Sequence, residues 1–85
     1  MRVSIRFFAS LKEAIQLDRL ELDLPETVVT IGDLRQYLSG YQLAWEDVFA
    51  PHKNIRAAQQ LQMVSIETPI IPGAEIAFFP PVTGG

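Results

Sequence analysis

The sequence predicts an α+β domain in which a mixed sheet of about five strands is packed by two or three helices. Three observations predict this class. Short stretches alternate apolar and polar residues, which is the period of a half-buried strand, and others repeat apolar residues at helical spacing. The last strand-like stretch, residues 75–79, is almost continuously apolar, which suits a central strand. It is followed by two prolines and, at the end, two glycines, which predict a flexible C-terminal tail.

The first half of the chain contains two predicted strands with a short helix between them. Residues 2–8 and residues 20–24 both alternate, so we expect an antiparallel pair. Ser10 and Glu13 have the spacing of a capping box, in which each side chain bonds the backbone of the other. This spacing predicts a helix over residues 11–15.

The second predicted helix begins after Thr30, a favoured N-cap residue, with Asp33 in its first turn. Its apolar residues repeat at helical spacing and Gly40 ends it, so we expect about ten residues. Tyr41 can extend the same apolar face. In the next stretch Trp45 and its neighbours can form an apolar helical face, which we interpret as a cover for the core.

The remaining predicted strands are short. Residues 55–59 and 63–66 have strand patterns, and proline and glycine turn signals separate them from the final strand. Since proline lacks a backbone N–H, pairing should fail after residue 79. We therefore divide the chain into a folded domain, residues 1–79, and an extended tail, residues 80–85. The tail consists of Pro80, Pro81, Val82, Thr83, Gly84 and Gly85.

The tail has the properties of a thin chemical handle. Its six residues can span about 20 Å when fully extended. Gly84 and Gly85 have no Cβ, so this end can enter a channel too narrow for other residues. The terminal carboxylate, with an ordinary pKa of about 3.3–3.7, is ionised and unreactive at neutral pH. To carry a group it must first be activated, most simply as an acyl-adenylate made from ATP, after which sulfur can displace AMP to leave a thiocarboxylate.

Composition excludes several other functions. A chain of 85 residues is one domain, and a net charge of −3 with scattered basic residues argues against a nucleic-acid surface. There is no cysteine, so any sulfur carried here must sit on the carboxylate. His52 is the only histidine, and we interpret it as a surface residue rather than a metal ligand. With no signal stretch and no apolar run long enough for a bilayer, we expect a cytoplasmic protein.

No residue pattern indicates catalysis by this chain alone. Neither a nucleophile with its general base nor a phosphate-binding loop is present. We therefore expect a carried substrate or subunit rather than an enzyme.

Two stretches resemble a known family. The last eleven residues, EIAFFPPVTGG, and residues 7–13, FFASLKE, are similar to the ends of molybdopterin synthase small subunits, which belong to the ubiquitin-like sulfur carriers. The family often has an asparagine-containing turn before the strand at residues 63–66, where this chain reads QQLQ over residues 59–62, which leaves the turn geometry open.

The resemblance implies a ubiquitin-like β-grasp fold with the first and last strands side by side and parallel. It implies a large catalytic subunit in a heterotetramer, an activating adenylyltransferase that uses ATP, and a sulfur-donor enzyme. No cofactor is expected on this chain itself. The implied product is a thiocarboxylate on Gly85 that donates sulfur to cyclic pyranopterin monophosphate. The residues expected to contact partners are Phe8, Lys12, Met63 and Phe79.

Some alternatives stay open for individual residues and for the function. Phe8 either packs under the next helix or presents an aromatic ring to a partner, and Lys12 is either solvated or pairs with an acidic partner surface. The chain could serve thiazole synthesis for thiamine, modify proteins by joining its tail to lysines, or be an interaction domain with an inert tail.

Overall fold

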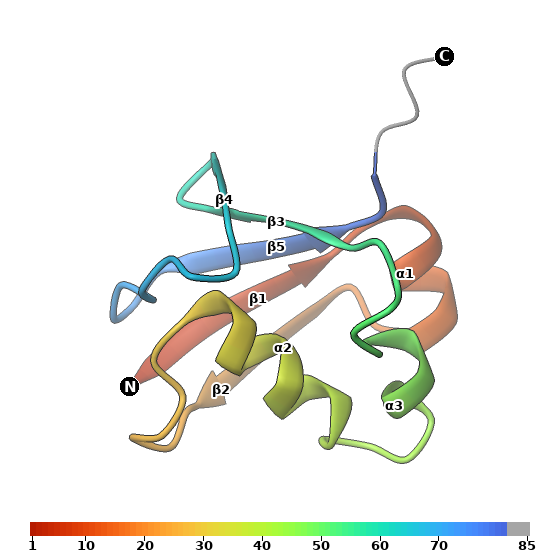
Figure 1. Ribbon diagram of the computed structural model, residues 1–85, viewed down its shortest axis with the longest axis horizontal. Helices are drawn as coiled ribbons and strands as arrows, with labels where there is room; N and C mark the ends of the chain where they lie inside the picture. The colour runs from red at the N-terminus through yellow and green to blue at the C-terminus, as the bar shows by residue number, and fades with distance from the viewer. Residues whose placement is uncertain (82–85) are drawn as a thin grey trace.

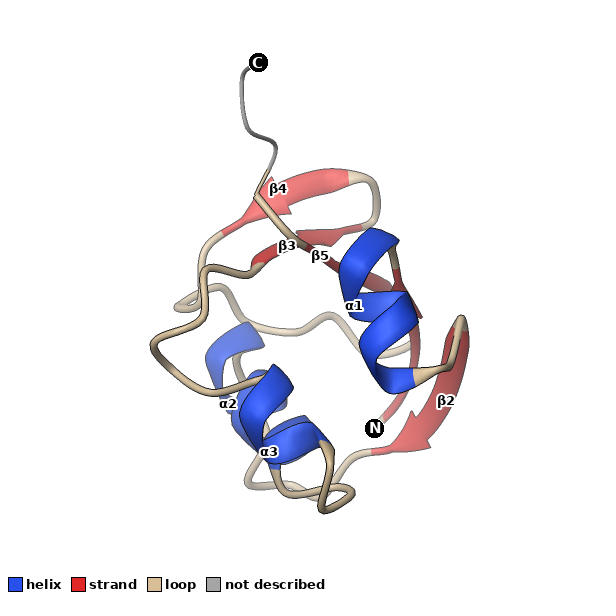
Figure 2. Cartoon of the chain, turned by 90° about the vertical axis from the view of Figure 1, so that its right-hand side faces the viewer, coloured by secondary structure: helices blue, strands red, loops and turns tan. Residues whose placement is uncertain are grey.

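The structure is a computed structural model that describes residues 1–81 (Figure 1). One five-stranded mixed sheet carries all of its helices on the same side (Figure 2). In chain order the elements are β1 (Arg2–Phe7), α1 (Ala9–Ile15), β2 (Arg19–Asp23), α2 (Ile31–Ser39), α3 (Trp45–Val48), β3 (Arg56–Gln59), β4 (Gln62–Val64) and β5 (Glu75–Phe79).

The strand order is β2-β1-β5-β3-β4, and only the pair β1–β5 is parallel. The predicted class and the parallel pairing of the first and last strands are therefore confirmed. Since β5 is the third of five strands, the chain's last strand lies in the middle of the sheet.

The core lies between the sheet and the helices and follows the predicted alternation. Each strand of the central pair directs every second side chain inward, and the apolar positions of the helices meet them. The largest fully buried side chains are Phe7, Phe49, Phe78, Ile5, Ile31, Leu34, Leu38, Ile76 and Val3.

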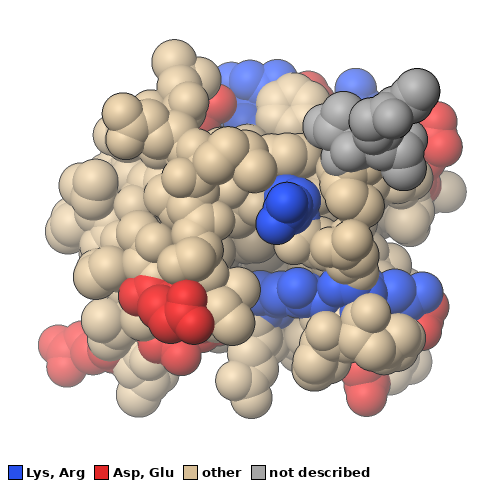
Figure 3. Space-filling model, turned by 45° about the horizontal axis from the view of Figure 1, so that its top comes forward, with Lys and Arg blue, Asp and Glu red and all other residues tan. Residues whose placement is uncertain are grey.

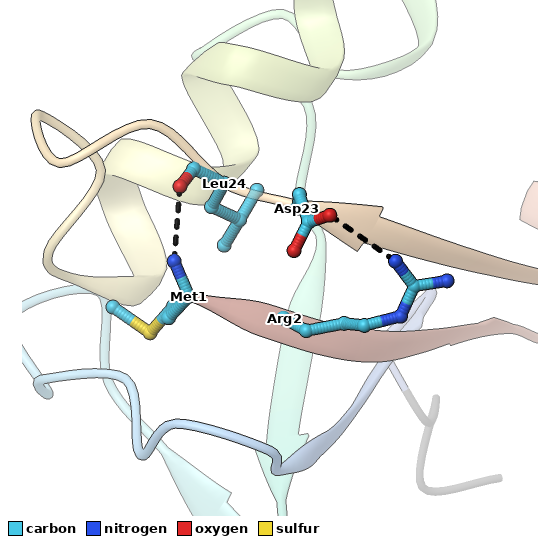
Figure 4. Close-up of polar contacts among 4 residues, drawn as sticks. All are labelled: Met1, Arg2, Asp23 and Leu24. Carbon is cyan, nitrogen blue, oxygen red and sulfur yellow. Dashed lines mark hydrogen bonds and ion pairs between the residues drawn. The ribbon is translucent and has the colours of Figure 1, made fainter.

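Polar contacts fasten the start of β1 to the end of β2 (Figure 4). The N-terminal ammonium of Met1 donates to the carbonyl of Leu24 at 3.1 Å. Arg2 pairs with Asp23 at 3.2 Å, and both side chains are mostly exposed. An exposed pair of this kind contributes little to stability, so the backbone ladder is the main link.

The beginning of α1 differs from the prediction. The helix begins at Ala9 and its N-cap is Phe8, which makes no side-chain capping bond. Ser10 lies inside the first turn, so the predicted capping box is wrong. The cause is the sharp exit from β1: Ala9 has a φ of 54°, and the Phe8 carbonyl accepts from the N–H groups of Leu11 and Lys12.

The second helix follows the prediction closely. The backbone N–H of Asp33 donates to the Thr30 hydroxyl, and that of Thr30 donates to the Asp33 carboxylate, each at 3.1 Å. Gly40 is the C-cap, while Tyr41 lies beyond the helix and is exposed. Trp45 is buried in α3, so this segment covers the core as expected.

The hairpin of β3 and β4 is shorter than predicted. The predicted strand over residues 63–66 ends at Val64, because the chain then leaves the sheet to meet the start of α2. There the N–H of Gly32 donates to the carbonyl of Ile66 at 2.8 Å. A Cβ at Gly32 would lie 3.1 Å from that same oxygen, so this crossing favours glycine.

Candidate functional site

The candidate site begins where β5 ends. Its last residue, Phe79, pairs with Arg56 of β3, and the strand stops before Pro80 as predicted. We call Phe79, Pro80 and Pro81 the tail root; all three are half-buried. The remaining tail residues, at which the carrier chemistry is predicted, lie outside the described part of the chain; they are Val82, Thr83, Gly84 and Gly85.

Buried aromatic rings hold the tail root in place. Phe78, directly before it, is 1% exposed and meets the ring of Phe49 edge-on, with 5.9 Å between the ring centroids. Phe49 in turn packs on Phe7 and Trp45 at 6.0 Å. Because these four rings come from β1, from α3 with its C-cap residue Phe49, and from β5, the end of β5 cannot shift without disturbing the core.

A second support comes from the segment that leads into β3. The guanidinium of Arg35 in α2 donates to the carbonyls of Phe49, Ala50 and Lys53. Partial burial lowers the pKa of Arg35 below its ordinary value. Three carbonyl acceptors compensate the lost hydration, so this residue fixes the path of the chain just before Arg56.

Three predicted partner-contact residues lie on the side of the sheet that the helices leave uncovered, which we call the outer face. Phe8 is 40% exposed, Met63 is 60% exposed and Phe79 is half-buried. The backbone N–H of Phe8 donates to the carbonyl of Phe78, which brings Phe8 next to the tail root. Phe8 is therefore not packed under α1 but available to a partner.

Met63 reaches the same face from the edge of the sheet. It pairs with Ala58, which pairs with Ala77 on β5, so small side chains connect Met63 to the central strands. The outer face near the tail root thus combines large and small apolar groups, which suits a protein interface better than a solvated surface.

Lys12 lies apart from these three. It stands on α1 and pairs with Asp18 of the same chain at 3.7 Å, and both side chains are 55% exposed. Asp18 is also 3.9 Å from Arg6, whose guanidinium lies 5.2 Å from the centre of the Phe8 ring. A charged network therefore connects Lys12 to the apolar residues of the outer face.

A shallow hollow of about 290 Å³ lies beside the tail root, with Pro80 in its wall. Leu11 and Ala14 of α1 contribute one side, and Val48 and Ile55 contribute the other. The hollow therefore offers a partner apolar surface on the side of the sheet that carries the helices, in addition to the apolar surface of the outer face.

Comparison with known proteins agrees with this geometry. The profile of the ThiS family matches residues 5–85. The chain belongs to the ThiS family. The molybdopterin synthase sulfur carrier subunit of Escherichia coli strain K12 is 35% identical, over 98% of this chain and 99% of that one. The predicted resemblance is thereby confirmed, as is the expectation of a carrier subunit rather than a self-sufficient enzyme.

Solved structures show the same fold. SAMP1 from Haloferax volcanii has a TM-score of 0.77 with 26% identity, and each chain is covered completely. One chain in the complex of subunits 1 and 2 of the molybdopterin-converting factor from Helicobacter pylori 26695 has a TM-score of 0.66 with 22% identity. The match covers both chains completely. These matches confirm the β-grasp fold that was predicted from the sequence.

Within residues 1–81 the structure contains no cluster of His, Cys, Asp and Glu side chains that could hold a metal ion. None of the described helices is long and apolar enough to cross a membrane.

Sequence reasoning missed one residue beside the tail root and one at the opposite end of β3, at the tip of its hairpin with β4. Arg56 was included only in a strand pattern, although alternation from the buried Ala57 places it on the outer face beside Phe79. Leu61 is 99% exposed at the tip of the β3–β4 hairpin, where Gln60 and Leu61 both have positive φ. The alternation could have revealed Arg56, but the turn type could not be read from Gln-Leu.

Proposed function

We propose that this chain is the sulfur carrier, the small subunit, of molybdopterin synthase. The observation that supports this best is 35% identity over almost the whole chain to a relative of that name. A tail that follows the central strand of a rigid sheet suits the function, because a carrier must present the root of its tail at a constant position.

The proposed chemistry takes place at Gly85. An activating adenylyltransferase joins the carboxylate to the α-phosphate of ATP and releases pyrophosphate. Sulfur from a donor enzyme then forms the new carbon–sulfur bond while the bond to AMP breaks, which leaves a thiocarboxylate. ATP belongs to the activating enzyme, and this chain needs no cofactor of its own.

The proposed acceptor is cyclic pyranopterin monophosphate, held by a large catalytic subunit. Two successive sulfur transfers from two carrier chains would supply the dithiolene of molybdopterin. In each, the sulfur would bond to the acceptor, and water would then hydrolyse its bond to the Gly85 carbonyl carbon and return the carboxylate. Gly84 keeps the entering end thin, and Val82 and Thr83 span the distance from the tail root. The cytoplasmic location expected for such a carrier is part of the proposal.

Docking on the large subunit is assigned to the outer face around Phe8, Met63 and Phe79. Burying a central apolar patch excludes water and aligns the tail with the pocket that receives it. Lys12 would contribute at the rim, where charges affect the rate of association more than affinity.

Reconstitution tests the proposal. The chain, the activating enzyme, ATP, a sulfur donor and the large subunit from the same organism should convert cyclic pyranopterin monophosphate to molybdopterin. A variant lacking Gly84 and Gly85 should form none. Equal product from the two chains would support an inert tail, and co-purification with a thiazole synthase instead of the large subunit would support thiamine synthesis.

A second candidate function is protein modification, favoured by the likeness to SAMP1, which is called a small archaeal modifier protein. It begins with the same adenylate, but a lysine amine attacks in place of sulfur. Conjugates of this chain that survive boiling with reductant, and disappear when Gly84 and Gly85 are deleted, would support it.

A further inference from the structure

The outer face of the sheet has a charged half and an apolar half. Around β2 it carries Arg19, Glu21 and Asp23, which alternate with the buried Leu22. Around β3, β4 and the end of β5 it carries Ala58, Met63, Ala77 and Phe79. In the apolar half one charged side chain stands next to the tail root: Arg56.

Most basic residues already have partners within the chain. Arg2, Arg6, Lys12 and Lys53 all form ion pairs with aspartate or glutamate, at 3.2–3.9 Å. Arg35 donates to backbone carbonyls. Among residues 1–81, Arg19, Arg35 and Arg56 form no ion pair with an acidic side chain, and of these Arg19 and Arg56 also make no side-chain hydrogen bond. In the view of Figure 3, one basic group near the middle of the face is surrounded by uncharged atoms, whereas others lie beside acidic groups.

Arg56 is also held in a defined position. Its backbone pairs with Phe79 on one side, and the Arg35 contacts fix the segment that ends three residues before it. Its side chain is exposed, whereas Ala57 directly after it is buried. The guanidinium is therefore presented from a rigid strand at the base of the tail rather than from a loop.

We propose that Arg56 forms an ion pair with a carboxylate of the large subunit, at the rim of the pocket that receives the tail. This inference rests on the proposed function. Arg56 pairs with Phe79, and Met63 pairs with Ala58 two residues further along β3, so a partner that covers Phe79 and Met63 would also remove water from Arg56. A desolvated charge without a counter-ion opposes binding, so the surface that fits here is apolar with an Asp or Glu opposite Arg56. The planar guanidinium can bind such a carboxylate through two parallel N–H donors.

The test measures the dissociation constant of the full chain and the large subunit from the same organism by isothermal titration calorimetry. R56Q should weaken binding at least tenfold, and R56E should weaken it further. R19Q is the matched control. Arg19 is also an exposed arginine of the outer face without an acidic partner in residues 1–81, but it lies on the edge strand β2. R19Q should therefore change the dissociation constant less than twofold. Raising the salt concentration should weaken binding of the wild-type chain more than that of R56Q.

The outcomes separate this inference from the proposed function. Wild-type affinity in R56Q, with a melting temperature equal to that of the wild type, would overturn the role of Arg56 and leave the carrier function standing. An R56Q chain that binds the large subunit normally but is adenylated slowly would also overturn it, because the acidic partner would then lie on the activating enzyme. Absence of binding by the wild-type chain would overturn both proposals.

Discussion

Phe78 and Phe79 are adjacent in the chain but face opposite sides of the sheet. Phe78 is almost fully buried against Phe49, whereas Phe79 is half-buried on the outer face. We expect Phe78→Ala to lower the free energy of unfolding by about 3–5 kcal/mol, the usual cost of replacing a buried phenylalanine by alanine. Phe79→Ala should cost less than about 1.5 kcal/mol but weaken binding to the large subunit. Urea denaturation and calorimetry measure the two effects, and equal destabilisation by both changes would contradict the assignment of faces.

Gln59 is a buried polar residue that stabilises a turn. Its amide nitrogen donates to the carbonyl of Pro69 at 3.1 Å, and its amide oxygen accepts from the N–H of Ile71 at 2.9 Å. Gln59→Met keeps the size but leaves both backbone groups unpaired, so we expect a loss of about 2 kcal/mol in unfolding free energy. Gln62→Met, at an exposed position of β4, is the control and should change stability by less than about 0.5 kcal/mol. If the two variants unfold at the same urea concentration, the role of Gln59 is wrong.

At the scale of the element, the start of α2 makes stability depend on pH. Backbone N–H groups of Val29 and Thr30 donate to the Asp33 carboxylate and lower its pKa below the ordinary value of 3.8. A lowered pKa means that the folded state favours the ionised form. The contribution is therefore complete above pH 3.8 and is lost as the pH falls through the folded-state pKa.

Asp33→Asn removes this dependence. The variant should be less stable than the wild type at pH 7, and the difference should shrink as the pH falls below 3.8. Thermal unfolding from pH 7 down to pH 2–3 measures the difference. A constant gap over that range would show that the charge of Asp33 does not contribute.

The β3–β4 hairpin has a turn whose residues do not suit its backbone. Gln60 and Leu61 have φ values of 51° and 68°, which are typical of a two-residue turn that prefers Asn-Gly. The double change Gln60→Asn and Leu61→Gly should raise the unfolding free energy by about 1 kcal/mol, because asparagine and glycine adopt positive φ with less strain. No packing is lost, since Leu61 is 99% exposed. Chemical denaturation checks this, and destabilisation would mean that Leu61 makes contacts in the free chain.

The elements predicted well are those that local sequence determines. Alternation identified β1 and β2, a nearly continuous apolar run identified β5, and a favoured N-cap with a glycine stop identified α2. The start of α1 was misjudged because a tight exit from β1, with a positive φ at Ala9, outweighed the capping potential of Ser10. The end of β4 was set by a distant contact between Ile66 and Gly32, which no local pattern reveals.

The candidate site was predictable only where side-chain alternation or a resemblance applied. Phe8, Met63 and Phe79 were expected to contact a partner, and they do share one face. Alternation along β3 shows which face Arg56 occupies, but its pairing with Phe79 depends on the strand order. The ion pair between Lys12 and Asp18 depends on the turn that follows α1, so neither contact could be predicted without the fold.

For the whole molecule, the sheet order explains how a small domain can present a tail firmly. Parallel pairing with β1 and antiparallel pairing with β3 hold β5 on both sides up to Phe79. The two prolines then end the ladder. In the proposed function, a partner recognises the rigid body and the outer face, and Gly85 carries the reactive group.

The most direct test of the account is the intact mass of the chain after incubation with the activating enzyme, ATP and a sulfur donor. The account predicts replacement of one oxygen by one sulfur, localised to Gly85 by fragmentation. A control chain with one phenylalanine added after Gly85 should keep its original mass. An unchanged mass for the wild-type chain, under conditions in which the activating enzyme converts its own carrier, would contradict the proposed function.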